Sequence, residues 1–250
     1  MNELSKALQL RGFFIVEESG YLRLGKGSHP DDEKDLKQML ANLNIPVTVN
    51  NQKINGLLDS LDAKKFQEIV WYPAKNHEAG GNGGYRSWKY FIKRMYGPKV
   101  RTNTLETGVA LFIKSLSGAG ITPISSCDGH GKRSPYISFF GVYNACWFMV
   151  IYRNLLNKLE LNYEWEIEKW NFSDPCLIAQ GNTGNWNLEL VLEDTSKMAG
   201  FLKDNGQKLS KLKRELFGAN RNSIRKQLKE MSHNEIIEWM EQKCKIIGFL

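Results

Sequence analysis

The chain has 250 residues, of which 42% are hydrophobic and 24% charged, which suffices for one large or two small folded domains. Its longest apolar run, Cys146–Tyr152, is far shorter than the roughly 20 residues that span a bilayer, so we exclude a transmembrane helix and expect no membrane partner. The formal net charge of +7 favours an anionic partner.

The N-terminus lacks a basic region followed by an apolar stretch, so we expect no secretory signal and a cytoplasmic location. The four cysteines are widely separated and include no C-x-x-C pair. This spacing argues against a disulfide framework and against a zinc ribbon.

Residues 1–75 predict a small N-terminal α/β module. A short helix precedes Phe13–Val16 and Tyr21–Leu24, which flank a Ser-Gly turn as the strands of a hairpin do. Ser28–Glu33 has the proline and acids typical of a helix start, and we expect that helix to end near Leu43. The remaining predicted elements are a strand over Ile45–Val49 and short helical segments over Ile54–Leu58 and Asp62–Val70.

Residues 76–86 contain four glycines in five positions and predict a flexible loop. Residues 87–194 then predict an α/β core, beginning with helical spacing over Ser87–Met95. A helix from about Thr104 to Leu116 leads into two strands, Ile121–Ser125 and Tyr136–Phe140. We further expect a helix over Asn144–Leu159, a strand over Tyr163–Glu168, and a hairpin of Cys176–Gln180 with Trp186–Leu192.

Residues 195–250 predict a basic helical extension, with twelve Lys or Arg against six Asp or Glu. The expected helices cover Ser196–Phe217, Asn222–Met231 and a segment after Ser232, which has capping-box spacing with Glu235. The basic side chains that we expect to contact nucleic acid are Lys211, Lys213, Arg214, Arg221, Arg225 and Lys226. The alternative is an ordinary solvated helix face. Overall the order of elements predicts an α+β fold, with antiparallel strands in a mixed core.

The turn Ser125-Ser126-Cys127-Asp128-Gly129-His130-Gly131 concentrates reactive groups between two predicted strands. His130 is the candidate acid–base group because imidazole titrates near neutrality, and Asp128 would orient it. Cys127 is a candidate nucleophile if His130 activates its thiol. The alternative is a tight turn in which the glycines adopt positive φ and the cysteine is merely buried.

Two further interpretations concern ligands of this turn. Cys127 and His130 form a C-x-x-H half-site, but further ligands are missing nearby in the sequence, so we expect no metal. The favoured interpretation is a phosphate site, formed by loop backbone N–H groups and basic side chains. Its expected members are Ser125, Ser126, Gly129, Gly131, Lys132, Arg133 and Arg101. Arg101 and Glu106 lie just before the helix that leads into the turn, and in the phosphate interpretation both face the same pocket. The alternative is that this segment only caps the helix and that Arg101 lies on the surface.

The order helix, glycine, strand, Ser-Ser-Cys-x-Gly, basic residues, strand resembles the amino-terminal signature of the wybutosine-synthesis methyltransferase family, which modifies a guanosine beside the tRNA anticodon. The matching residues are Ser125, Ser126, Cys127 and Gly129, over roughly 35 residues. His130 stands where that family has arginine. The turn is also similar to uncharacterised phage and bacterial proteins with a Ser-Cys-acid-Gly-His turn. The resemblance implies a tRNA substrate and S-adenosylmethionine as cofactor; the residues themselves indicate no cofactor.

Charge and the reactive turn together predict a protein directed at RNA or a nucleotide, whether or not it catalyses a reaction. One version is a tRNA-modifying enzyme, and the alternative is a non-catalytic module that sequesters a nucleotide. A protein-interaction domain with an acidic partner is a third hypothesis.

Overall fold

The structure is a computed structural model, which describes residues 2–56, 61–75, 91–94, 97–168, 175–181, 184–218 and 221–246. Its elements form an α+β fold in which the sheets are antiparallel, as the sequence predicts. The apolar side chains gather in two clusters, one built almost entirely from residues 4–70 and one from residues 100–244. The predicted glycine-rich loop over residues 76–86 lies outside the described residues.

The N-terminal cluster lies between three helices and a sheet of strand order β1-β2-β4-β3. The hairpin β1 (Ile15–Glu18) and β2 (Tyr21–Leu24) confirms the prediction from its Ser-Gly turn. The helices are α1 (Glu3–Arg11), α2 (Asp32–Asn42) and α3 (Ala63–Val70). The short strands are β3 (Thr48–Asn50) and β4 (Lys53–Asn55).

The larger cluster surrounds a second antiparallel sheet, of order β7-β8-β10-β9. Its strands are β7 (Pro123–Cys127), β8 (Tyr136–Phe139), β9 (Glu164–Glu168) and β10 (Cys176–Gln180). Helix α4 (Thr107–Gly118) packs against β7 and is almost wholly buried, while α5 (Val142–Asn154) follows β8. A separate hairpin joins β5 (Phe91–Arg94) to β6 (Gly97–Val100).

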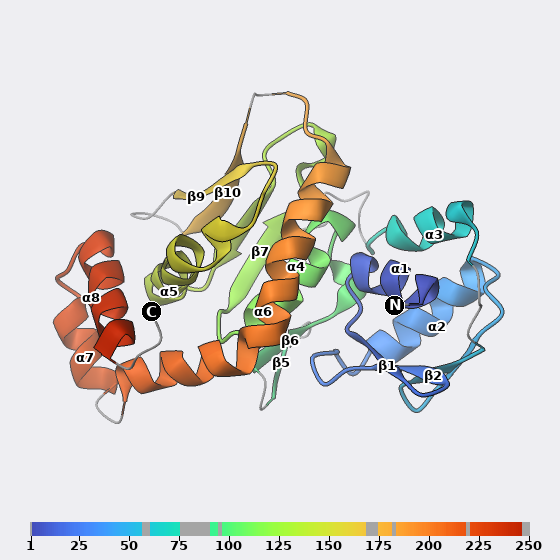
Figure 1. Ribbon diagram of the computed structural model, residues 1–250, viewed down its shortest axis with the longest axis horizontal. Helices are drawn as coiled ribbons and strands as arrows, with labels where there is room; N and C mark the ends of the chain where they lie inside the picture. Colours follow the sequence, from blue (N-terminus) through green and yellow to red (C-terminus); the bar gives the residue numbers. More distant parts are fainter. Residues whose placement is uncertain are drawn as a thin grey trace.

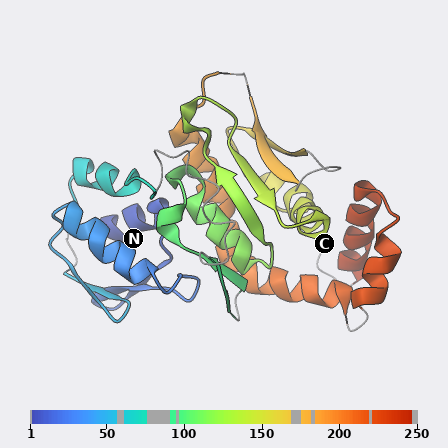
Figure 2. The ribbon, with the colours of Figure 1, turned by 180° about the vertical axis from the view of Figure 1, so that it is seen from behind.

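Three C-terminal helices complete the chain: α6 (Leu188–Phe217), α7 (Arg221–Leu228) and α8 (His233–Ile246). Figure 1 shows α6 lying along α4 and then continuing away from the N-terminal sheet to α7 and α8, at the opposite edge of the molecule. Figure 2, from behind, shows β7 and β8 in front of α4 and α6. At the start of α8, Glu235 N donates to Ser232 Oγ and Ser232 N donates to Glu235 Oε2, which confirms the capping box.

Three predicted elements are wrong. Lys53–Asn55 is a strand, because it pairs with both β2 and β3, where we expected a helical segment from Ile54. Phe91–Arg94 is likewise a strand paired with β6. The expected hairpin partner of β10, Trp186–Leu192, instead enters α6 at Leu188, and β10 pairs with β8 and β9.

Among the described residues no helix is long and apolar enough to span a bilayer.

Candidate functional site

The reactive turn follows β7 and places its side chains at the first turn of α4. Asp128 directly follows the strand, and its carboxylate accepts a hydrogen bond from the His130 backbone N–H at 3.1 Å. Gly129 and Gly131 have φ of +81° and +71°, and His130 itself has φ of +52°. Glycine adopts positive φ without strain, so Gly129 and Gly131 add no strain to the turn. His130 is the one residue of the three whose side chain makes its positive φ unfavourable.

Glu106, the residue before α4, joins this turn to the helix. Its Oε2 accepts the Asp128 backbone N–H at 2.8 Å, while Oε1 lies 3.2 Å from His130 Nε2. Glu106 is buried, with 7% of its surface exposed, and its carboxylate interacts with both the Cys127 thiol and the His130 imidazole. One carboxylate oxygen therefore fixes the loop and the other is directed into the cluster.

Cys127 completes the cluster from the end of β7. Its Sγ lies 3.4 Å from His130 Nε2 and accepts the Gly129 N–H at 3.3 Å. The guanidinium of Arg133 approaches the same sulfur at 3.5 Å. One potential metal-binding atom from each of Glu106, Cys127, Asp128 and His130 lies within 4.8 Å of all the others.

The electrostatics of the cluster favour a cation. Burial and the neighbouring Asp128 carboxylate raise the pKa of Glu106 above its usual value. Burial and the Glu106 carboxylate likewise raise the pKa of the Cys127 thiol. A raised thiol pKa is the opposite of what an activated cysteine nucleophile needs, so the protein by itself does not activate Cys127.

The imidazole of His130 has one nitrogen facing each side of the cluster. Nδ1 lies 3.5 Å from Asp128 Oδ1, whereas Nε2 faces the thiol and Glu106 Oε1. A carboxylate beside the second ring nitrogen is the arrangement that orients metal-binding histidines. The side chain of His130 is 26% exposed, so the cluster is open to solvent on that side.

The geometry agrees with the spacing of ligands around one metal ion. Donor atoms bound tetrahedrally to zinc at about 2.0 to 2.3 Å lie about 3.3 to 3.7 Å from one another. The distances of 3.2 Å from Nε2 to Glu106 Oε1 and 3.4 Å from Nε2 to Cys127 Sγ are close to this spacing. The arrangement can therefore supply three donors from Glu106, Cys127 and His130, with Asp128 as a positioning residue.

The loop amides do not form the expected phosphate cradle. The backbone N–H groups of Asp128, Gly129 and His130 donate to side chains of the cluster, and those of Lys132 and Arg133 donate to the Gly129 carbonyl. Ser125 and Ser126 are buried within β7. Of the expected phosphate-binding side chains, those of Lys132 and Arg133 are exposed beside the cluster.

Arg101 and Glu106 do not face the same site: Glu106 lies beside His130, whereas Arg101 lies against α2. Its guanidinium makes two bonds of 2.5 Å to the Asp35 carboxylate of α2, which raises the pKa of Arg101. The sequence predicts Glu106 only as a neighbour of Arg101 and does not place it among the expected ligands. The sequence signal that identifies Glu106 as a further ligand is its position directly before the helix that precedes the strand and the Cys-x-x-His turn.

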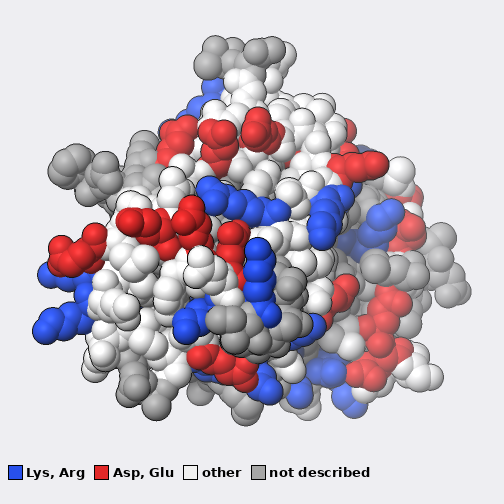
Figure 3. All heavy atoms as spheres, turned by 60° about the vertical axis from the view of Figure 1, so that its left-hand side comes forward, with Lys and Arg blue, Asp and Glu red and all other residues white. Residues whose placement is uncertain are grey.

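The basic residues of the C-terminal helices have mixed surroundings. Lys213 donates to the Gly120 carbonyl and to Asn144 Oδ1, and Lys211 pairs with Glu215. The Arg225 guanidinium lies over the Tyr143 ring, while Arg214 and Lys226 are exposed. The side chain of Arg221 lies outside the described residues. Figure 3 shows basic and acidic side chains interspersed over the described part of its face.

No protein-family model, curated protein or solved structure matches this chain.

Proposed function

We propose that this protein is a zinc-dependent enzyme, whose metal is held by Glu106, Cys127 and His130 and whose substrate is a nucleotide or nucleic acid. The observation that carries the proposal is the convergence of three donor atoms, since His130 Nε2 lies 3.2 Å from the buried Glu106 Oε1 and 3.4 Å from Cys127 Sγ. Carboxylate, thiolate and imidazole are ligands that zinc binds, and a metal ion at this point compensates the burial of the Glu106 carboxylate.

Glu106, Cys127 and His130 would supply three protein donors, and three protein donors are typical of catalytic rather than structural zinc sites. A zinc ion held there would supply Lewis-acid chemistry and would lower the pKa of water to about 7, which suits hydrolysis. The chain's own residues hold the donors: Asp128 positions the His130 ring, and the Gly129 N–H supports the thiolate at 3.3 Å.

The substrate class rests on charge beside the cluster. Lys132 and Arg133 follow the turn with exposed side chains. The exposed Arg214 and Lys226 lie away from the cluster, since α6 begins beside the turn and Arg214 and Lys226 lie near its far end and on α7. Such side chains attract phosphates without specifying a sequence. The resemblance to a tRNA-modifying family, carried by Ser125, Ser126, Cys127 and Gly129, points to the same class of substrate and remains a prediction.

The first test is the metal content of the full chain, purified without chelators and without a metal-affinity tag. We expect about one zinc per chain in the wild type and loss of that zinc in Cys127→Ser, His130→Gln and Glu106→Gln. Cobalt substitution gives a second readout, because a thiolate ligand produces a charge-transfer absorption that Cys127→Ser abolishes. Cys176→Ser and His233→Gln, outside the cluster, serve as matched controls that retain the metal.

A folded wild type that takes up no zinc when supplied with the ion refutes the metal site and leaves His130 as the candidate acid–base group. The substrate is tested separately, by mass spectrometry of tRNA and of a nucleotide mixture incubated with the zinc-loaded protein. A zinc protein that binds these ligands without altering them is a binding module. A zinc protein that binds neither at low salt refutes the substrate class alone.

A further inference from the structure

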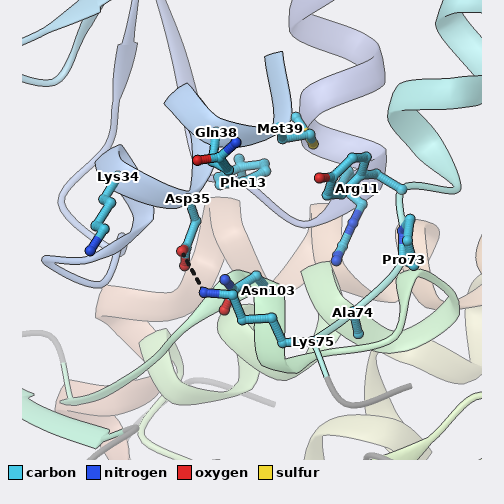
Figure 4. Close-up of a pocket in the computed structure, with 11 residues that line it drawn as sticks. Arg11, Phe13, Lys34, Asp35, Gln38, Met39, Pro73, Ala74, Lys75 and Asn103 are labelled. Carbon is cyan, nitrogen blue, oxygen red and sulfur yellow. Dashed lines mark ion pairs between the residues drawn. The ribbon is translucent and has the colours of Figure 1, made fainter. Parts of the chain in front are cut away.

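A second site lies between the N-terminal helices and the segment before α4. The structure has a pocket of about 310 Å³ there, near the lower end of the size range of small-molecule sites. Its apolar wall includes Phe13, Met39 and Tyr72, and its polar wall includes Arg11, Asn103 and Lys75. Figure 4 shows that these side chains come from separate parts of the chain and meet around one space.

Arg11, the last residue of α1, is the most unusual member of this wall. Only 1% of its surface is exposed, and it has no carboxylate within ion-pair distance among the described residues. One of its nitrogens, Nη1, donates to the Leu105 carbonyl at 3.1 Å, and Nε has no partner. A buried guanidinium without a direct ion pair is costly to keep in a folded protein, and here the more distant carboxylates of Asp32, Asp35 and Asp128 stabilise its charge.

The charged residues that line the pocket form no direct ion pair with Arg11. Asp35 also lines the pocket, but its carboxylate is bound by Arg101 through two bonds of 2.5 Å. Lys75 lies at 3.7 Å from the same carboxylate, as the dashed line in Figure 4 marks, and Lys34 adds a further positive charge. The lining therefore carries more positive than negative charge.

A second polar atom of the wall is also without a partner. Asn103 is 8% exposed, and its Oδ1 accepts no hydrogen bond, although its backbone carbonyl accepts the Lys75 N–H at 2.7 Å. A ligand hydroxyl or amine supplies such an acceptor with a donor. Burial lowers the pKa of Arg11 to about 10, an effect that a bound anion reverses.

We infer that this pocket binds a small organic anion, whose phosphate or carboxylate group contacts the Arg11 guanidinium and whose apolar part lies against Phe13, Met39 and Tyr72. Guanidinium groups form paired hydrogen bonds with both kinds of anion, so the shared chemistry is a planar or tetrahedral oxyanion. This site goes beyond the proposed zinc centre and does not depend on it.

The test is calorimetric titration and thermal melting of the full chain with phenyl phosphate, benzoate and benzyl alcohol, the last as a neutral control. We expect saturable binding of at least one anion, no binding of the alcohol, and affinity at least about tenfold lower in Arg11→Met. Binding of phenyl phosphate alone assigns a phosphate ligand, and binding of benzoate assigns a carboxylate. Arg23→Met, in the same part of the chain but only partly buried and paired with Glu18, is the matched control.

The stability of the variant separates a binding role from a structural one. If Arg11 serves to bind an anion, removing its buried charge, which has no direct ion pair, leaves the melting temperature of the ligand-free protein unchanged or higher. The inference is overturned if neither anion binds at millimolar concentration, or if Arg11→Met binds as tightly as the wild type. Zinc content is not expected to change in Arg11→Met, so the failure of this inference and that of the zinc site are distinguishable.

Discussion

Lys114 of α4 and Asp32 of α2 form a buried ion pair that joins the two apolar clusters of the molecule. Their side chains are 1% and 0% exposed, and Nζ lies 2.6 Å from Asp32 Oδ2. The same carboxylate accepts the backbone N–H groups of His29 at 2.9 Å and Thr102 at 2.8 Å. Replacing Lys114 by Met keeps the length of the side chain but leaves a buried carboxylate with only these two amide donors.

We expect Lys114→Met to lower the free energy of unfolding by about 3 to 5 kcal/mol, the range for breaking a buried pair by removing one partner. At a urea dependence of about 2 kcal/mol/M, the midpoint of unfolding falls by about 1.5 to 2.5 M. Urea titrations followed by tryptophan fluorescence and circular dichroism measure this shift. The double variant Asp32→Asn with Lys114→Met is expected to lose less than the sum of the two single variants, because the unpaired charge is removed.

Lys37→Met is the matched control, because it breaks an ion pair on the surface of the same helix as Asp32. Lys37 Nζ lies 2.9 Å from Glu33 one helical turn away, and its side chain is 46% exposed. Its loss costs about 0.3 to 0.5 kcal/mol. A fall for Lys114→Met as small as that of the control contradicts the assignment of the buried pair as a structural link.

The remaining predictions concern the site, pH and thiol reactivity. Asp128→Asn keeps an oxygen for the loop but weakens the orientation of the metal ligand, and competition with a chelator is expected to show zinc affinity about 10- to 100-fold lower. Gly108→Ala places a methyl group 2.7 Å from Asp128 Cβ and is expected to reduce zinc content, unlike Gly118→Ala, whose methyl group meets nothing within 4 Å. Burial lowers the pKa of His29 in the folded state below the ordinary histidine value of 6.5. Below pH 6.5 the unfolded state therefore binds more protons than the folded state, and the free energy of unfolding decreases as the pH is lowered. Urea midpoints at pH 7 and pH 5 are expected to differ less in His29→Asn than in the wild type. Burial raises the pKa of Cys146 to about 12, so a thiol reagent is expected to label it only after unfolding, and prompt labelling of the native protein contradicts this.

Local patterns in the sequence determine most of the helices and several strands. The acids after Pro30 mark the start of α2, the apolar spacing marks α4, and Ser232 with Glu235 marks the start of α8. These signals are local because a cap, a turn or a helical face involves residues only a few positions apart.

Pairing between distant segments decides the elements that the sequence misassigns. Lys53–Asn55 and Phe91–Arg94 become strands because β2 and β6 offer backbone partners, which no local pattern reveals. The start of α6 does have a local signal, which is the helix-capping residue Asn187. Its side chain accepts the Glu189 backbone N–H at 2.9 Å. The turn residues between Gln180 and Trp186 predict a hairpin instead, and this local pattern points away from the cap.

The candidate site shows the same division between sequence and tertiary structure. The sequence by itself determines that Cys127, Asp128 and His130 share one turn, because two glycines at positive φ and a short strand are local features. Only the tertiary structure brings Glu106 to His130, by packing the first turn of α4 against the end of β7. It also buries Arg11 beside a pocket and sets Arg101 against Asp35, because burial and charge pairing depend on segments that meet only in the folded chain.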